Sequence, residues 1–213
     1  PVFLELDMKP QVLTILGATG TIGVNTLDVV ERHPEAFQVF ALTGATQTDK
    51  LYEQCLRFAP RYAVMTRADA AGELRRRLAE AGSKTEVLAG ERALIEVSTA
   101  AEVTTLMAAI VGAAGLPATL AAARAGKRIL LANKETLVVS GQLFMDAIKT
   151  SGARLLPIDS EHSAIFQSLP QDFSGDLEAA GVSLIWLTAS GRPSRTWTRE
   201  QMENVTPEQA LVH

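Results

Sequence analysis

Glycine recurs at every third position where the first apolar run of the chain meets its first amphipathic run. Residues 12–16, apolar except for Thr14, predict a buried strand, and Gly17, Gly20 and Gly23 follow directly. Apolar residues from Ile22 to Val30 then recur at helical spacing. Between a strand and a helix, such glycines permit a tight turn, close approach to a pyrophosphate, and close packing of helix on strand. The junction therefore predicts the first unit of a dinucleotide-binding sheet, with the helix N-terminus facing the anion.

Apolar and amphipathic runs continue to alternate along the chain. This alternation predicts an α/β protein with a Rossmann-like, doubly wound and mostly parallel sheet. The predicted boundary is Ser151-Gly152, which divides the chain into domains at residues 1–151 and 152–213. Further strands are expected at residues 38–43, 62–65, 86–88, 103–111, 128–132, 153–158 and 182–189, and helices at 48–58, 69–81, 91–97, 117–125, 136–149, 164–169 and 198–205.

The end of the second predicted strand bears on the choice of cofactor. An NAD enzyme usually places an acid here for the ribose diol. Ala45, Thr46 and Gln47 stand in this place, with no acid before Asp49 and no base before Lys50. The missing acid favours NADP, although no residue offers an obvious clamp for its 2′-phosphate.

Two acids follow the strand predicted at residues 153–158. Asp159 and Glu161 flank Ser160 at the carboxyl end of that strand, where open α/β sheets bind their ligands. Carboxylates this close repel unless a cation lies between them, and Mg²⁺ or Mn²⁺ takes oxygen ligands. The alternative is that Ser160 caps a helix and Glu161 complements its dipole.

Polar residues also follow two other predicted strands. Asn133, Lys134 and Glu135 come after residues 128–132, and Ser190 comes after residues 182–189. Lys134 could hold a phosphate or polarise a carbonyl, and Ser190 could contact a phosphate or hydroxyl. An exposed helix start and an ordinary exit from a strand are the alternatives.

Charge and composition exclude several classes of protein. The net charge of −4 argues against nucleic-acid binding driven by phosphate contacts. The single cysteine, Cys55, fits a reducing compartment such as the cytoplasm. The window 103–123 has no charged residue, but its glycines and proline favour a strand, a turn and a helix over a membrane span.

Four sequence blocks together resemble a known family. They are G-A-T-G-T-I-G at 17–23, L-A-N-K-E-T-L at 131–137, P-I-D-S-E-H-S-A-I-F-Q-S-L at 157–169 and L-T-A-S-G at 187–191. In this order they resemble the 1-deoxy-D-xylulose 5-phosphate reductoisomerase family over nearly the whole chain from Met8. That family isomerises its phosphorylated sugar substrate and reduces it with NADPH to 2-C-methyl-D-erythritol 4-phosphate, in non-mevalonate isoprenoid biosynthesis.

The resemblance implies a role for particular residues. Asp159 and Glu161 match two of three carboxylates that hold Mg²⁺ or Mn²⁺, and with Lys134 they form the expected catalytic set. The substrate positions are Lys134, Ser160, Glu161, Ser190 and His213. The cofactor positions are Gly17, Thr19, Gly20, Thr21, Ile22, Gly23, Ala45, Thr46, Gln47, Asn133 and Glu135.

The sequence also departs from the family pattern. Ala45-Thr46-Gln47 replace the usual Gly-Lys-Asn, and Gly191-Arg192-Pro193-Ser194 replace Gly-Gly-Pro-Phe. Family chains are nearly twice as long, so the third metal acid is expected beyond His213, residues 152–213 are expected to be the first part of a second α/β catalytic domain, and this polypeptide alone is expected to be inactive. The full-length protein is expected to be a homodimer.

A non-catalytic NADP-binding sensor or scaffold is the alternative function. It would explain the glycine loop but gives no reason for Asp159 and Glu161 at a strand end. A short-chain reductase is disfavoured because neither Tyr52 nor Tyr62 lies in a Tyr-x-x-x-Lys motif.

Overall fold

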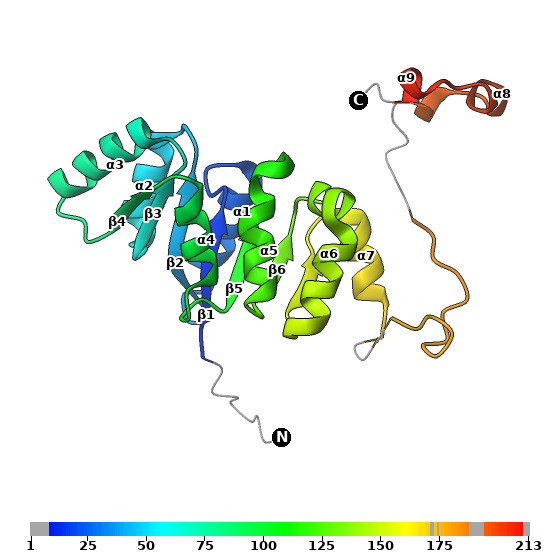
Figure 1. Ribbon diagram of the computed structural model, residues 1–213, viewed down its shortest axis with the longest axis horizontal. Coiled ribbons are helices and arrows are strands. Elements are labelled where there is room, and N and C mark those ends of the chain that lie inside the picture. Colours follow the sequence, from blue (N-terminus) through cyan, green and yellow to red (C-terminus); the bar gives the residue numbers. More distant parts are fainter. Residues whose placement is uncertain (1–8, 171–172, 174, 188–193, 211–213) are drawn as a thin grey trace. The chain divides into compact units, whose positions relative to one another are not determined.

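The structure is a computed structural model that describes residues 9–170, 173, 175–187 and 194–210 (Figure 1). The chain divides into two compact units, of which the first ends at Asp159 and the second begins at Ser160.

The first unit is built on a seven-stranded sheet with strand order β4-β3-β2-β1-β5-β6-β7. All six neighbouring pairs run parallel, which confirms the predicted parallel α/β sheet. Strands β2 to β4 are added on one side of β1, and β5 to β7 are added on the other side. The switch point between β1 and β5 is where ligands bind in such sheets. The strands are β1 Gln11–Leu16, β2 Phe37–Gly44, β3 Tyr62–Met65, β4 Glu86–Ala89, β5 Thr105–Ala108, β6 Arg128–Leu131 and β7 Arg154–Pro157.

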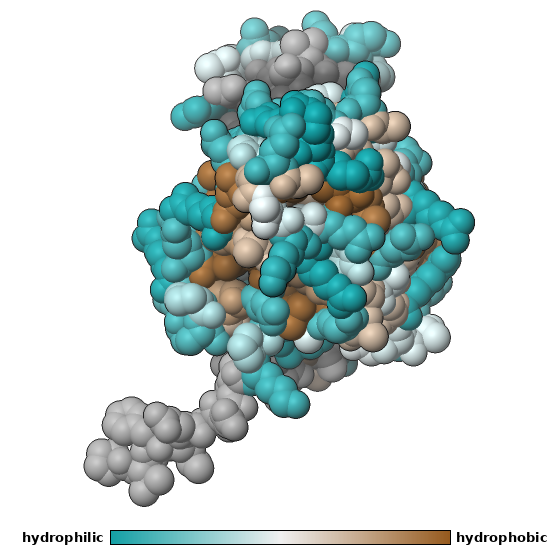
Figure 2. Space-filling model, turned by 90° about the vertical axis from the view of Figure 1, so that its left-hand side faces the viewer, coloured by the Kyte–Doolittle hydropathy of each residue, from teal (hydrophilic) through white to brown (hydrophobic). Residues whose placement is uncertain are grey.

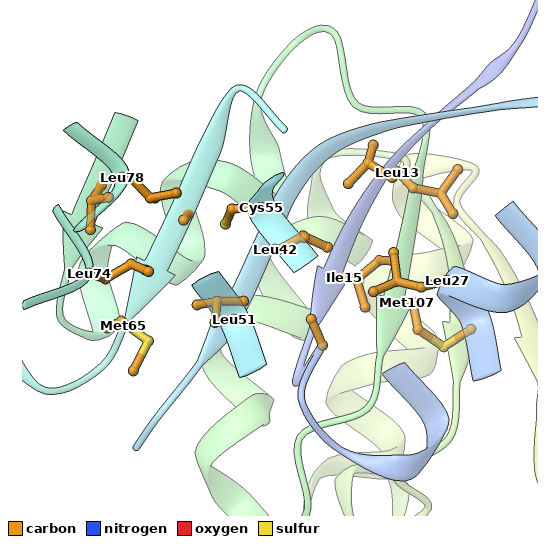
Figure 3. Close-up of a cluster of buried hydrophobic side chains, with 14 of the residues drawn as sticks. Leu13, Ile15, Leu27, Leu42, Leu51, Cys55, Met65, Leu74, Leu78 and Met107 are labelled. Carbon is orange, nitrogen blue, oxygen red and sulfur yellow. The ribbon is translucent and has the colours of Figure 1, made fainter. Parts of the chain in front are cut away.

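Helices cover both faces of this sheet, as a doubly wound fold requires (Figure 1). On one face, α1 Thr21–Arg32, α2 Thr48–Phe58 and α3 Ala68–Glu80 pack a core that includes Leu27, Leu51, Leu74 and Ile15 (Figure 3). On the other face, the buried core includes residues of α4 Glu91–Thr99, α5 Leu116–Arg124 and α6 Glu135–Ser151. Because both faces are covered, the strands have continuous apolar runs in place of alternating ones.

The uncharged window at residues 103–123 folds as a strand, a turn and a helix, as its glycines and proline predict. It contains β5, the short 3-10 helix η1 Gly112–Gly115, and most of α5, whose first turn holds Pro117. The strand is shorter than the predicted span of 103–111, because the chain leaves the sheet after Ala108. Within the described residues, no helix has the length and hydropathy needed to cross a membrane.

Charged side chains dominate the surface around α3. Figure 2, which views the molecule from this side, shows mostly hydrophilic residues with smaller hydrophobic areas between them. Arg76 pairs with Glu73 and Glu80 on α3, and Arg67 pairs with Asp69. Such exposed pairs add little to stability, because water screens them, so the apolar core holds the unit together.

The second unit contains helices in its described part. They are α7 Ser160–Ser168, the 3-10 helix η2 Ser194–Thr196, α8 Arg199–Glu203 and α9 Pro207–Ala210. Thr198 caps α8 in a capping box with Gln201, which stabilises so short a helix.

The strand predicted at residues 182–189 is wrong over 182–187, where the chain is irregular. Residues 188 and 189 lie outside the described part. A strand is stabilised by its backbone partners, and every strand pairing in the described residues belongs to β1–β7. The apolar side chains remain exposed instead: Leu184 is 65% exposed, Trp186 82% and Leu187 60%.

Candidate cofactor and metal site

The loop from Gly17 to Gly20 joins β1 to α1 at the switch point of the sheet. Gly17 has a φ of +77°, and a Cβ atom there would lie 2.8 Å from the carbonyl oxygen of Ala109. A Cβ atom on Gly23 would collide with the carbonyl oxygen of Gly17 and the Cα of Ala18. Glycine is therefore required at both positions, first for the turn and then for close packing of helix on loop.

The N-terminus of α1 is open to a ligand. Its N-cap residue is Gly20, no side chain caps the helix, and its first turn contains no acid. Gly20 and Thr21 are exposed, and Ile22 is also exposed. The first N–H groups of a helix lack partners within it and carry the positive end of the dipole. This arrangement suits a phosphate anion.

Side chains from β2 and α2 hold the glycine loop in place. The backbone N–H of Gly17 donates to the Thr43 hydroxyl at 2.9 Å. From α2, Lys50 Nζ donates to the Thr19 carbonyl at 2.7 Å, and Gln54 Nε2 donates to the Ala18 carbonyl at 2.8 Å. None of these three supports was predicted from the sequence. The available signal was a polar residue, Gln54, on the otherwise apolar buried face of α2.

The end of β2 presents no charge at the predicted ribose positions. Ala45, Thr46 and Gln47 are exposed and uncharged. The first acid, Asp49, pairs with Arg77 at 2.5 Å. The end of β2 therefore has no free carboxylate at the positions where an NAD enzyme would bind the ribose diol.

Asn133 connects the end of β6 to the loop after β5. It is 5% exposed, and its Nδ2 donates to the carbonyls of Ile110 at 2.5 Å and Gly112 at 2.6 Å. Its Oδ1 is buried without a hydrogen-bond partner among the described residues. A buried acceptor without a donor costs about 1–3 kcal/mol, so this atom marks a place where a ligand donor fits.

Lys134 and Glu135 follow Asn133 at the start of α6. Lys134 is the N-cap residue, Glu135 lies in the first turn, and both are exposed. Since β1, β5 and β6 are parallel neighbours, the residues after them lie at the same edge of the sheet as the glycine loop. The structure thus brings the predicted cofactor residues and Lys134 to one edge.

The two predicted metal acids lie on either side of the boundary between the compact units. Asp159 ends the first unit after β7 and is half-buried. Glu161 lies in the first turn of α7 and is half-buried as well. Their oxygen donors suit a hard divalent cation. Among the described residues, no group of three or more His, Cys, Asp or Glu is placed to hold a metal.

The alternative interpretation of residues 159–161 is that Ser160 caps a helix and Glu161 complements its dipole. Helix α7 begins at Ser160 itself, so Ser160 is a helical residue and not the residue before the helix. Glu161 in the first turn does complement the dipole, a role compatible with metal binding. Glu161 also lines a hollow of about 390 Å³ within the second unit, whose other walls include Ile165 and Trp186. Ser190 and His213 lie outside the described residues.

Comparisons with known proteins identify the family. The family model for 1-deoxy-D-xylulose 5-phosphate reductoisomerase matches residues 13–141, and the model for the C-terminal domain of that enzyme matches residues 155–213. The chain belongs to the 1-deoxy-D-xylulose 5-phosphate reductoisomerase family.

Individual reductoisomerases agree closely with this chain. The 1-deoxy-D-xylulose 5-phosphate reductoisomerase of Laribacter hongkongensis is 62% identical over 203 residues, and that of Pseudomonas paraeruginosa is 60% identical over 205. These matches cover 95% and 96% of this chain but 52% of each relative. The chain thus spans about half the length of the curated relatives it matches.

A solved reductoisomerase structure agrees with the fold as well. It is a complex with NADPH, fosmidomycin and magnesium, 44% identical in sequence, with a TM-score of 0.82. The match covers 95% of this chain and 51% of that one.

Proposed function

We propose that this chain carries the cofactor-binding part and two metal ligands of a 1-deoxy-D-xylulose 5-phosphate reductoisomerase. The reaction is the isomerisation of 1-deoxy-D-xylulose 5-phosphate and its reduction to 2-C-methyl-D-erythritol 4-phosphate, dependent on NADPH and a divalent metal. The observation that carries the proposal is the glycine loop with its uncapped helix, in a chain that belongs to this family. The 213 residues on their own have little or no turnover.

The cofactor lies along the edge that the glycine loop and β6 share. The N–H groups of Thr21, Ile22 and Gly23 at the start of α1 bind the pyrophosphate, and Gly17 and Gly20 let it approach. Thr19 and Ala45-Thr46-Gln47 border the ribose. Farther along the edge, Asn133 offers its buried Oδ1 to a donor of the cofactor and Glu135 lies beside it. When bound, NADPH supplies the hydride.

Asp159 and Glu161 hold Mg²⁺ or Mn²⁺. When bound, the metal supplies Lewis-acid polarisation of the substrate oxygens. Lys134, exposed at the start of α6, binds and orients the negatively charged substrate. Ser160, Ser190 and His213 contribute further substrate contacts, and Lys134, Asp159 and Glu161 form the catalytic set.

The organisation of the whole protein follows from the same proposal. Residues 1–151 form the NADPH-binding domain, and residues 152–213 begin the catalytic domain. The full-length enzyme is a cytoplasmic homodimer that uses a phosphorylated sugar.

Calorimetric titration tests the proposal in two steps. The 213-residue chain is expected to bind NADPH, and to bind Mn²⁺ weakly through Asp159 and Glu161. The double variant D159N/E161Q is expected to lose the Mn²⁺ signal and keep NADPH binding. D146N, which changes an exposed acid on α6, is the matched control. NADPH binding with no response to Mn²⁺ would favour a sensor, and binding of neither ligand would refute the proposal.

A further inference from the structure

Lys50 is the first basic residue after β2, and its ammonium group lies against the glycine loop. It sits in the first turn of α2 and is half-buried. Its Nζ donates to the Thr19 carbonyl at 2.7 Å. An ammonium group has three donors, and the described residues provide an acceptor for one of them.

The same region is the ribose end of a dinucleotide site. A Cβ atom on Gly44, the last residue of β2, would lie 3.5 Å from the side-chain methyl of Thr19. The loop residue that binds Lys50 therefore packs beside the end of β2. In dinucleotide-binding folds the adenosine ribose lies at this strand end, where a basic residue accommodates a 2′-phosphate.

Lys50 forms no direct ion pair with a carboxylate of the described residues. Among the described residues, no carboxylate oxygen lies within 4.0 Å of its Nζ. Two other bases close to α2 are occupied, because Arg57 pairs with Glu31 and Arg77 pairs with Asp49. Lys50 is thus the positive charge that this part of the chain leaves available at the loop.

The direction from which a phosphate can reach Lys50 is limited. A hollow of about 290 Å³ between α1 and α2 is lined by Lys50 and also by the acids Asp28, Glu31 and Glu53. These carboxylates repel a phosphate inside the hollow. The side of Lys50 that faces the glycine loop is the one where these acids do not oppose an anion.

We propose that Lys50 recognises the 2′-phosphate of NADPH and sets the preference for NADPH over NADH. It takes the place of the lysine that the family pattern usually has where Thr46 stands in this chain. The inference rests on the proposed function, since it assigns a specificity residue to the same cofactor site. Gln54 holds the Ala18 carbonyl independently at 2.8 Å, so the loop keeps one support when Lys50 is changed.

Binding of cofactors and of their adenosine fragments tests the inference. Dissociation constants for NADPH, NADH, adenosine 2′,5′-bisphosphate and 5′-AMP are measured by calorimetry. In K50Q, which keeps a donor for Thr19 but no charge, affinity for the two 2′-phosphorylated ligands is expected to fall about 10- to 100-fold. Affinity for NADH and 5′-AMP is expected to stay within about twofold. K50R is expected to retain the preference, and K84Q, at an exposed lysine far along the chain, is the control.

The other possible results overturn either the role of Lys50 or the proposed function. An equal loss for all four ligands would make Lys50 a support of the loop and overturn the inference, as would no loss at all. A wild-type chain that binds none of the four ligands would refute the proposed function itself. Thermal unfolding verifies that K50Q is folded, and K50M is the second uncharged variant should K50Q fail to fold.

Discussion

The two compact units differ in how they bury apolar side chains. Between Leu13 and Ala153, strands and helices enclose two large clusters of buried residues, one on each face of the sheet. From Ser160 to Gln209, none of the described residues is buried, and Trp186 and Leu184 are largely exposed. A fold needs buried apolar area to offset the entropy of ordering the chain. The comparison teaches that the first unit has its own core, whereas the described part of the second has none.

The rate of turnover is expected to show the largest effect of this difference between the units. The 213-residue chain is expected to bind NADPH through its first unit but to turn over at least about 100-fold more slowly than the Laribacter hongkongensis enzyme, because a complete metal site contributes several kcal/mol to catalysis. The measurement is oxidation of NADPH with substrate and Mn²⁺. Rates equal to those of the relative would show that the second unit is catalytically complete.

Truncation of one large side chain in each unit tests the comparison through stability. Phe144→Ala removes a ring that is 0% exposed on α6 and is expected to lower the free energy of unfolding by about 3–5 kcal/mol. Trp186→Ala is expected to change it by less than about 0.5 kcal/mol, because that side chain is 82% exposed. Denaturant unfolding followed by circular dichroism measures both. Similar losses in the two variants would contradict the assignment of the core to the first unit.

Glycine substitutions separate loop geometry from helix propensity within the first unit. Gly23→Ala places a methyl group against the Gly17 carbonyl and is expected to destabilise the chain by about 1–3 kcal/mol, with weaker NADPH binding. Gly72→Ala on α3 meets nothing within 4 Å and is expected to stabilise it by about 0.5–1 kcal/mol. Thermal unfolding and calorimetry distinguish the two. Unaltered NADPH binding in Gly23→Ala would contradict the assignment of the glycine loop to the cofactor site.

The buried thiol of Cys55 makes the stability of the first unit depend on pH. Burial raises the pKa of the Cys55 thiol from 9.0 to about 12. The folded chain therefore keeps a proton that the unfolded chain loses, and the stabilisation present below pH 9 declines as the pH rises toward 12. Between pH 9 and 10 the expected loss is about 1 kcal/mol. Urea unfolding at both pH values measures it, and Cys55→Ala should lack this part of the pH dependence.

Much of the first unit could be predicted from the sequence, because local signals and long-range packing agree there. The predicted helix at residues 48–58 and strand at 62–65 match α2 and β3 in full. The strand at 182–189 failed over its described part because apolar content alone does not supply a pairing partner. The edge that carries Asn133 and the glycine loop was predictable from parallel topology.

The supports of the loop were not predictable in the same way. The contact between Lys50 and Thr19 joins residues 31 positions apart, and it depends on where α2 lies beside the glycine loop. From the sequence, Lys50 is recognisable only as the first base after the second predicted strand. The roles of Ser190 and His213 stay predictions, since both residues lie outside the described part.

The order of the strands sets a length for whatever binds along this edge. Three steps separate β1 from β7, and neighbouring strands lie about 4.8 Å apart, so the ends of β1 and β7 are about 14 Å apart across the sheet. A compact molecule seated on the glycine loop cannot touch Asp159. Only an elongated molecule reaches from one end of this interval toward the other, and Asn133, in the turn after β6, lies between the two ends. The strand spacing thus sets a minimum length of about 14 Å for any single ligand that contacts both the glycine loop and Asp159.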